Sequence, residues 1–146
     1  METNAFKSLK YIDYPHRTYD KIRYRDTDRQ EHVNNSVFST FFETGRVEFM
    51  VNPEKPIACP DCSFVIASIK MDFLQEINWP GIIEIGTGIT KLGNSSITIV
   101  QGLYQNNQLV GYAESVIVQV SNNTKKSHPL SEHAKQILSS YLLQIA

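Results

Sequence analysis

The stretch SVFSTFFETGRVEFM, residues 36–50, decides the fold. Its large apolar side chains recur at steps of three and four residues, which is the spacing of one face of an α-helix. Phenylalanine and glycine are poor helix formers, so we expect burial against another element, rather than intrinsic propensity, to hold this helix. Asn34 and Asn35 are natural N-caps, and the Asn-Pro pair at residues 52–53 ends the pattern.

Five other segments alternate apolar and polar residues with a period of two, which predicts β-strands. The asparagine pair at residues 106–107 predicts a tight turn between the last two segments, because asparagine tolerates a positive φ. In the last segment, Val110, Tyr112 and Val116 are expected to share one face. The predicted strands cover residues 21–25, 63–73, 82–91, 96–104 and 109–120, and a shorter helical pattern runs through residues 130–141.

The order of these elements is a strand, a long helix, four antiparallel strands and a small C-terminal helix. Strands that cluster after a helix indicate an α+β protein with one antiparallel sheet. A length of 146 residues suits a single domain. The helix can cover one face of the sheet, and two chains could share the remaining apolar surface by forming a dimer.

Charge and composition narrow the classes of partner. The chain has 14 basic and 15 acidic residues, and this balance favours neither nucleic acid nor an anionic membrane surface. The N-terminus lacks the pattern of a signal peptide, so the expected location is the cytoplasm. Cys59 and Cys62 form an isolated C-x-x-C without a second pair, and the histidines are scattered, so the sequence indicates no metal site.

The segment RYRDTDRQEHVNN, residues 23–35, lies between the first strand and the long helix. If it is extended, Asp28, Gln30 and His32 point the same way. The following helix presents unpaired backbone N–H groups that favour negative charge. A carboxylate, an amide, an imidazole and an anion-binding backbone suit acyl transfer. The alternative is that these residues only form turns and helix caps.

The pattern YxDxDxxxHVNN at residues 24–35 resembles the signature of hotdog-fold thioesterases of the 4-hydroxybenzoyl-CoA thioesterase-like family. The phrase FETGRVEF at residues 42–49 is similar to the central helix of that family. A Lys-x-x-x-Pro-Leu phrase at residues 125–130 agrees in kind and spacing, and the resemblance covers residues 19–140 or so. Glu31 departs from many bacterial members, which have glycine before the histidine.

This resemblance implies one hotdog domain over residues 1–146, with a long central helix packed on a five-stranded antiparallel sheet and a small C-terminal helix. It implies hydrolysis of acyl thioesters of coenzyme A or of acyl carrier protein, with no metal or cofactor. The family assembles as homodimers or tetramers of dimers, with clefts between subunits. A hotdog protein that binds acyl thioesters without hydrolysing them is the alternative from another class.

The family's catalytic aspartate corresponds to Asp28, which members use as a nucleophile or as a general base. Gln30 and His32 resemble the Asp-x-Asn-x-His pattern of plant acyl-carrier-protein thioesterases and would position water or substrate. Asp26 is expected to be structural. The candidate substrate-binding residues, each of which can also be read as a cap or an ordinary surface charge, are Asn34, Asn35, Glu43, Lys91 and Lys125.

Overall fold

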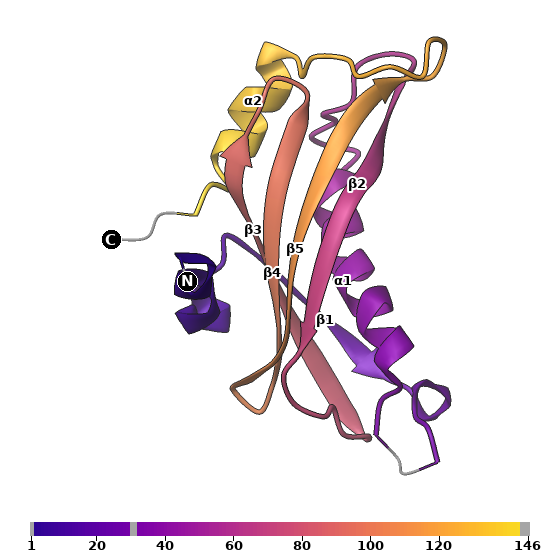
Figure 1. Cartoon of the computed structure of the whole chain (residues 1–146), viewed down its shortest axis with the longest axis vertical. Coiled ribbons are helices and arrows are strands. Elements are labelled where there is room, and N and C mark those ends of the chain that lie inside the picture. Colours follow the sequence, from indigo (N-terminus) through magenta and orange to yellow (C-terminus); the bar gives the residue numbers. More distant parts are fainter. Residues whose placement is uncertain (1, 30–31, 144–146) are drawn as a thin grey trace.

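The computed structural model describes residues 2–29 and 32–143 and shows a long helix lying across an antiparallel sheet (Figure 1). Among the described helices, none combines the length and the apolar character needed to cross a membrane. The elements in chain order are the 3₁₀ helices η1 (Glu2–Ser8) and η2 (Tyr11–Asp13), β1 (His16–Ile22), the 3₁₀ helix η3 (Tyr24–Asp26), α1 (Asn35–Met50), β2 (Cys62–Phe73), β3 (Gly81–Leu92), β4 (Ser96–Gln105), β5 (Gln108–Ser121) and α2 (Glu132–Ser139).

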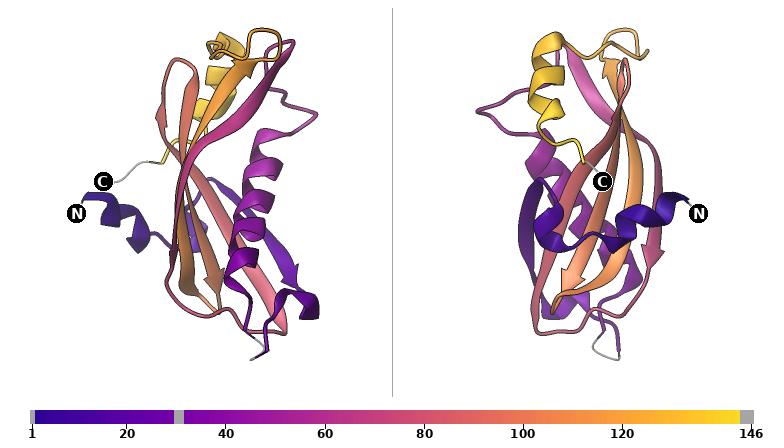
Figure 2. Two further views of the ribbon diagram at one scale, coloured as in Figure 1. Left: turned by 45° about the vertical axis from the view of Figure 1, so that its right-hand side comes forward. Right: turned by 90° about the vertical axis from the view of Figure 1, so that its left-hand side faces the viewer.

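The five strands form one sheet in the order β1-β3-β4-β5-β2, and every neighbouring pair is antiparallel. β1 and β2 are therefore the two edge strands. α1 lies against one face of this sheet, and the N-terminal segment lies on the opposite face (Figure 2). This arrangement confirms the predicted α+β class with its five-stranded sheet, long helix and small C-terminal helix.

The apolar face of α1 holds the helix on the sheet, as its spacing predicted. Phe38, Phe41 and Phe42 are almost completely buried, and they pack with Ile83 and Ile85 of β3 in one core cluster. Burying an aromatic or branched side chain of this size stabilises a fold by about 1.5–3 kcal/mol. The helix therefore depends on tertiary packing, since its own residues are weak helix formers.

Gly45 lets the middle of α1 approach the sheet closely. A Cβ at this position would lie 2.7 Å from Gln101 Nε2, 2.7 Å from Ile85 Cγ2 and 2.9 Å from Thr87 Oγ1. Gln101 Nε2 already donates to the Phe42 carbonyl at 2.9 Å and to Thr87 Oγ1 at 3.0 Å. A buried amide thus ties the helix backbone to β3 and β4 at the place where the helix has no side chain.

The first strand lies earlier in the chain than predicted. β1 spans His16–Ile22, whereas the sequence pattern indicated residues 21–25. Tyr24 does not share the face of the buried Ile22, because it lies in η3 and is 65% exposed. The physical reason is local: the Asp26 carboxylate accepts a hydrogen bond from the Arg23 amide at 2.8 Å, which closes a turn instead of extending the strand.

The predicted shared face of the last strand is wrong at Val110, whereas Tyr112 and Val116 lie in an uninterrupted register and share a face. Leu103 pairs with Gly111, whereas the next residue of β4 pairs with Leu109, so one extra residue interrupts the register at Val110. Val110 packs in the cluster under α1, and Tyr112 packs in the cluster on the opposite face. A bulge of this kind reverses the alternation of side chains beyond it, and a single sequence does not reveal it.

The N-terminal segment covers the face of the sheet opposite α1. Tyr104 Oη donates a hydrogen bond to the Leu9 carbonyl at 2.6 Å, and Lys7 Nζ lies 2.8 Å from Asp72 Oδ2. Tyr14 is buried at the centre of the cluster formed there. This segment has no strong helical or strand pattern, so contacts with the sheet rather than local propensity account for its placement.

His16 lies at the beginning of β1 between two aromatic rings. Its ring centroid is 5.9 Å from that of Phe49 and 6.4 Å from that of Tyr141. Its Nδ1 atom is buried and has no hydrogen-bond partner in the part of the chain that the structure describes. Burial lowers the pKa of His16, and the negative charge of Glu48 opposes this effect.

We expect His16 to make the fold less stable in mild acid. Its pKa in the unfolded chain is about 6.5, and in the folded chain it is lower. As the pH falls below about 6.5 the unfolded chain takes up the proton first, so the free energy of unfolding decreases until the folded pKa is passed. Urea unfolding measures the free energy of unfolding at about pH 7.5 and about pH 5.5. Its decrease between these two values should be smaller for His16→Phe than for the wild type. An equal loss in both proteins would contradict this role.

Candidate active site

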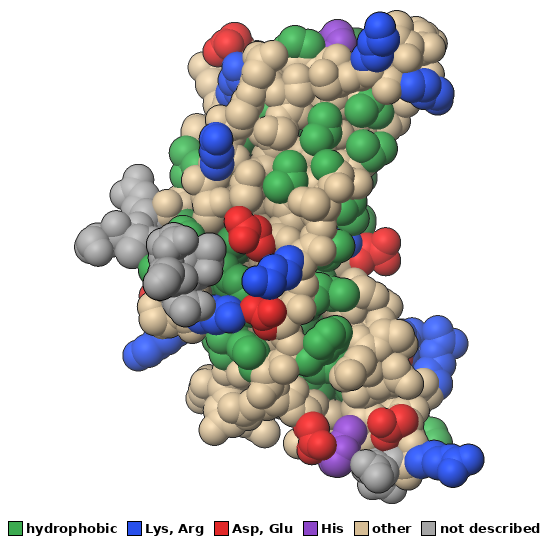
Figure 3. Space-filling view, in the orientation of Figure 1, with side chains coloured by type: hydrophobic (Ala, Val, Ile, Leu, Met, Phe, Trp, Pro, Cys, Tyr) green, Lys and Arg blue, Asp and Glu red, His purple; other side chains and the backbone are tan. Residues whose placement is uncertain are grey.

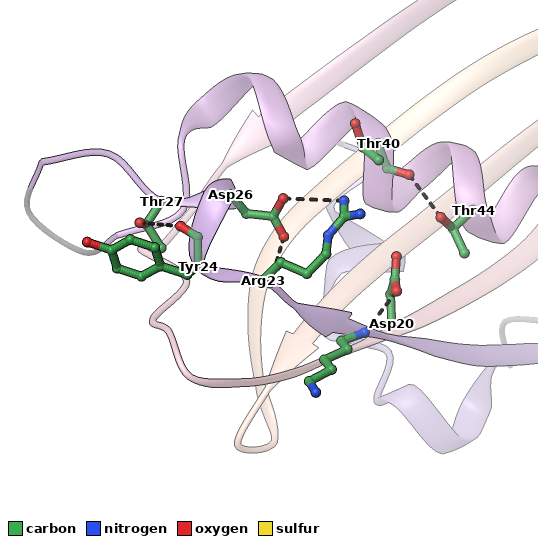
Figure 4. Close-up of polar contacts among 8 residues, drawn as sticks. Asp20, Arg23, Tyr24, Asp26, Thr27, Thr40 and Thr44 are labelled. Carbon is green, nitrogen blue, oxygen red and sulfur yellow. Dashed lines mark hydrogen bonds and ion pairs between the residues drawn. The ribbon is translucent and has the colours of Figure 1, made fainter.

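The segment between β1 and α1 begins with η3, which is fixed by Asp26. The Asp26 side chain is buried, accepts from the Arg23 amide at 2.8 Å and lies 3.4 Å from the Arg23 guanidinium (Figure 4). The Thr27 hydroxyl donates to the Tyr24 carbonyl at 2.7 Å. Asp26 is therefore structural, as the sequence analysis expected.

After η3 the chain reverses direction instead of continuing extended. Thr27 pairs with Val33 in an antiparallel bridge, and the Asp28 amide donates to the His32 carbonyl at 2.9 Å. The chain is therefore not extended from Asp28 to His32, so the condition under which these side chains were expected to point the same way is not met. The turn nevertheless brings these two residues together across its base. Gln30, the third residue of the predicted set, lies outside the described residues.

The loop between β2 and β3 supports this turn from the side. The Val33 amide donates to the Ile77 carbonyl at 2.8 Å, and His32 forms an antiparallel bridge with Asn78. His32 Nε2 lies 3.2 Å from Glu76 Oε1. Sequence reasoning missed Glu76, because an acidic residue between two strands has no distinguishing pattern. The imidazole at the site is thus oriented by a carboxylate from a distant part of the chain.

Asn34 caps α1, and Asn35 is the first residue of the helix. The Asn34 side-chain oxygen accepts a hydrogen bond from the Ser36 amide at 3.0 Å. The main-chain carbonyl of Asn34 accepts another from the Val37 amide at 2.9 Å. The sequence offered both asparagines as N-caps, and this is correct for Asn34 only. Two amides of the first helical turn are therefore already hydrogen-bonded by the cap.

These elements place Asp28 in the turn that leads into the N-terminus of α1. Asp28 is exposed, in a turn whose base is held by main-chain hydrogen bonds from residues 26–34 and from the loop before β3. Negative charge near a helix N-terminus is stabilised by the helix dipole. A carboxylate, a carboxylate-paired imidazole and this helix end can serve a reaction in which negative charge develops on a carbonyl oxygen.

The other predicted substrate-binding residues lie elsewhere in the same chain. Glu43 lies in the middle of α1, about 12 Å along the helix axis from its first residue. Lys91 is at the far end of β3, whose first residue pairs with Ile22 beside the site. Lys125 lies in the turn after β5, with a φ of 63°. One chain therefore gathers Asp28, His32, Asn34 and Asn35, and it does not gather Glu43, Lys91 and Lys125 with them.

A cavity of about 610 Å³ opens beside the C-terminal half of α1. The loop at residues 51–58, the beginning of β2 and Ile117 of β5 complete its wall. Volumes of 300–1,000 Å³ or so are typical of small-molecule sites. The wall is mainly apolar, with Glu43 and Arg46 as its charged residues. Among the described residues, no group of three His, Cys, Asp or Glu side chains could hold a metal ion.

The family of the chain follows from its sequence. The sequence profile described as "Thioesterase-like superfamily" matches residues 22–138, which is most of the chain. The chain belongs to the thioesterase-like superfamily, and it is a thioester hydrolase. This confirms the resemblance drawn from residues 24–35 and 42–49. No curated protein sequence matches the chain.

Solved structures confirm the hotdog fold. The protein PA5185 of Pseudomonas aeruginosa is 20% identical with a TM-score of 0.80, covering 94% of this chain and 98% of its own. A Thermus thermophilus thioesterase, solved with coenzyme A and zinc, is 23% identical with a TM-score of 0.75, covering 92% and 98%. The probable thioesterase YbaW of Escherichia coli is 20% identical with a TM-score of 0.72, covering 87% and 98%. At these identities the likeness establishes the fold.

Proposed function

We propose that this thioester hydrolase acts on acyl-CoA, releasing a free acid and coenzyme A, with Asp28 as its catalytic carboxylate. The observation that carries the proposal is the position of Asp28, exposed in a turn held against the N-terminus of α1. The coenzyme A bound to the Thermus thermophilus thioesterase of the same fold supports coenzyme A as the leaving group.

Two mechanisms use the same carboxylate. As a nucleophile, Asp28 attacks the thioester carbonyl, the C–S bond breaks, and water then hydrolyses the resulting anhydride. As a general base, Asp28 takes a proton from a water molecule whose oxygen attacks the carbonyl, and the proton then goes to the departing thiolate. His32, paired with Glu76, would position the water or the thioester. Gln30 keeps its predicted positioning role.

Both mechanisms need donors for the developing oxyanion. The Ser36 and Val37 amides are already hydrogen-bonded to the Asn34 cap. The donors that we propose at the start of the helix are therefore the backbone and side-chain amides of Asn35. The helix dipole adds a favourable potential at the same place. Losing one oxyanion donor typically costs about 10²–10³ in rate.

We further propose that two chains pair through their β2 edges. β2 is an edge strand of 12 residues, and Val65, Ile66 and Ile69 on it are exposed. A band of hydrophobic side chains follows β2 and β5 on the surface (Figure 3). A long unpaired edge of this kind is a template for pairing with another strand. Closed two-fold pairing would give a homodimer, and larger assemblies of such dimers remain a prediction.

Such a dimer would account for the separated substrate-binding residues. In an antiparallel β2 pair, the end of one sheet that carries Lys125 lies near the end of the other sheet that carries Asp28. Lys125 and Lys91 of one copy could then contact the phosphates of a coenzyme A whose thioester lies at Asp28 of the other copy. Glu43, on the helix next to β2, would line the cleft between the copies.

The proposed substrate class is tested by thiol release from short, long and aromatic acyl-CoA esters, each matched with the same acyl group on acyl carrier protein. We expect turnover of at least one coenzyme A ester above the rate without enzyme. Turnover of carrier-protein esters alone would instead identify an acyl-carrier-protein thioesterase. Tight binding without turnover of either would support a non-catalytic hotdog protein and overturn the proposal.

A further inference from the structure

Arg46 is a buried charge for which the described part of the chain supplies no counter-ion. Its residue surface is 7% exposed, and its Nη1 atom is buried without a hydrogen-bond partner among residues 2–29 and 32–143. Within those ranges it forms no ion pair. Burial lowers the pKa of Arg46, and the Glu43 carboxylate opposes this effect from outside ion-pair distance.

An unpaired guanidinium in this position is energetically unfavourable. Charged side chains are almost never fully buried unless they are paired, because removing the charge from water is costly. Two neutral oxygens on the sheet under α1, Gln101 Oε1 and Ser115 Oγ, are also buried without hydrogen-bond partners within the described part of the chain. The middle of the helix–sheet interface therefore contains buried polar atoms without hydrogen bonds, at a place where apolar atoms would be more favourable.

Arg46 lines the cavity of about 610 Å³ beside α1. Most of the wall is apolar, and Met50, Ile57 and Phe64 are among its side chains. The apolar wall suits a hydrocarbon portion of a ligand, and a buried guanidinium suits a carboxylate, which it can bind through two parallel hydrogen bonds. The cavity therefore matches a molecule that is mainly apolar and carries one anionic group.

We propose that this cavity receives the acyl group of a thioester held at Asp28 of the second copy in the proposed β2 pair, and that Arg46 binds a carboxylate at the far end of that group. The substrates would then be ω-carboxyacyl thioesters, the mono-thioesters of dicarboxylic acids. The inference rests on the proposed thioesterase function, and it adds a specificity-determining residue to it. The carboxylate of the substrate would supply the acceptor that Arg46 does not find among the described residues.

The test compares ω-carboxyacyl-CoA esters of six, eight and ten carbons with plain acyl-CoA esters of the same lengths. In the wild type we expect a higher kcat/KM for the carboxylated member of at least one pair. Arg46→Met should lower the ratio of kcat/KM for the carboxylated ester to that for the plain ester by about 10- to 150-fold, because hydrogen bonds to charged groups contribute about 1.5–3 kcal/mol. Arg46→Lys should restore part of the ratio.

Lys55→Met is the matched control. Lys55 is exposed in the loop beside the cavity and does not line it, so its loss should leave the ratio unchanged. Thermal unfolding of each variant shows whether the fold is kept. An unchanged ratio in a folded Arg46→Met protein would overturn the inference, and so would a wild type that prefers the plain acyl group at every length. The second result would mean that another group, such as one from a second copy, neutralises Arg46.

Direct binding separates this inference from the proposed function. Calorimetric titration with octanedioate and with its dimethyl ester, which has the same chain and no carboxylate, needs no turnover. Stronger binding of octanedioate that is lost in Arg46→Met would support the role of Arg46 even if no thioester were hydrolysed. Hydrolysis of acyl-CoA esters without any effect of Arg46 on either measurement would leave the thioesterase in place and remove the carboxylate specificity.

Discussion

Replacing Asp28 with asparagine should lower kcat/KM for the best acyl-CoA substrate by about 10³-fold, within the range of about 10²–10⁴ that a general acid or base contributes. Asparagine keeps the size of the side chain and removes the negative charge that either attacks the thioester or activates water. Asp28 is exposed, so the substitution should leave the unfolding temperature close to that of the wild type. Thiol release at saturating and at low substrate, with a thermal melt of each protein, measures both quantities.

Asp26 provides the matched control, because it is two residues away and buried. Asp26→Asn replaces the charged acceptor of the Arg23 amide by a neutral one and should lower the unfolding temperature. Any loss of activity in this variant should be explained by the smaller fraction of folded protein. The two aspartates therefore separate a chemical effect from a structural one. Undiminished turnover in a folded Asp28→Asn protein would reject Asp28 as the catalytic carboxylate, and Glu76 and Glu43 would then be the next carboxylates to test.

The fold could be predicted from the sequence because its main elements carry strong patterns. The spacing of phenylalanines in residues 36–50 and the alternation in β3 required no tertiary knowledge, and both were correct. The placement of β1 failed because one side-chain hydrogen bond, from the Arg23 amide to Asp26, converts an alternating stretch into a turn. In β5 the predicted orientation failed only for Val110, because the sequence pattern does not reveal the bulge at that residue.

The candidate site was predictable only where its residues are adjacent in the chain. Asp28, His32 and Asn34 share one short segment, so a motif could indicate them together. Glu76 is 44 residues after His32 and meets it only because the loop before β3 pairs with the turn. Arg46 was hidden for another reason: within an amphipathic helix, a charged residue is normally assigned to the solvent face. Its burial results from tertiary packing, which the pattern of the helix alone does not show.

Gly45→Ala should destabilise the protein by about 2–4 kcal/mol, which is a large part of the stability of a domain of this size. Alanine is the better helix former by about 1 kcal/mol, so an exposed helix would gain stability from this change. Here the new Cβ would lie 2.7 Å from both Gln101 Nε2 and Ile85 Cγ2, and α1 would have to move away from the sheet. That movement would strain the hydrogen bonds of Gln101 to Phe42 and Thr87.

Urea unfolding of Gly45→Ala and of Thr40→Ala distinguishes this effect from helix propensity. Thr40 is an exposed residue of α1, and its replacement should change the free energy of unfolding by less than about 0.5 kcal/mol. The double variant Gly45→Ala, Gln101→Ala should be less destabilised than the sum of its single changes, because the shorter side chain removes the closest polar clash. A stabilised Gly45→Ala protein would mean that helix propensity outweighs the close approach of α1. Since Arg46 follows Gly45, a helix raised from the sheet would also move the guanidinium from the cavity, so Gly45→Ala should weaken octanedioate binding along with the fold.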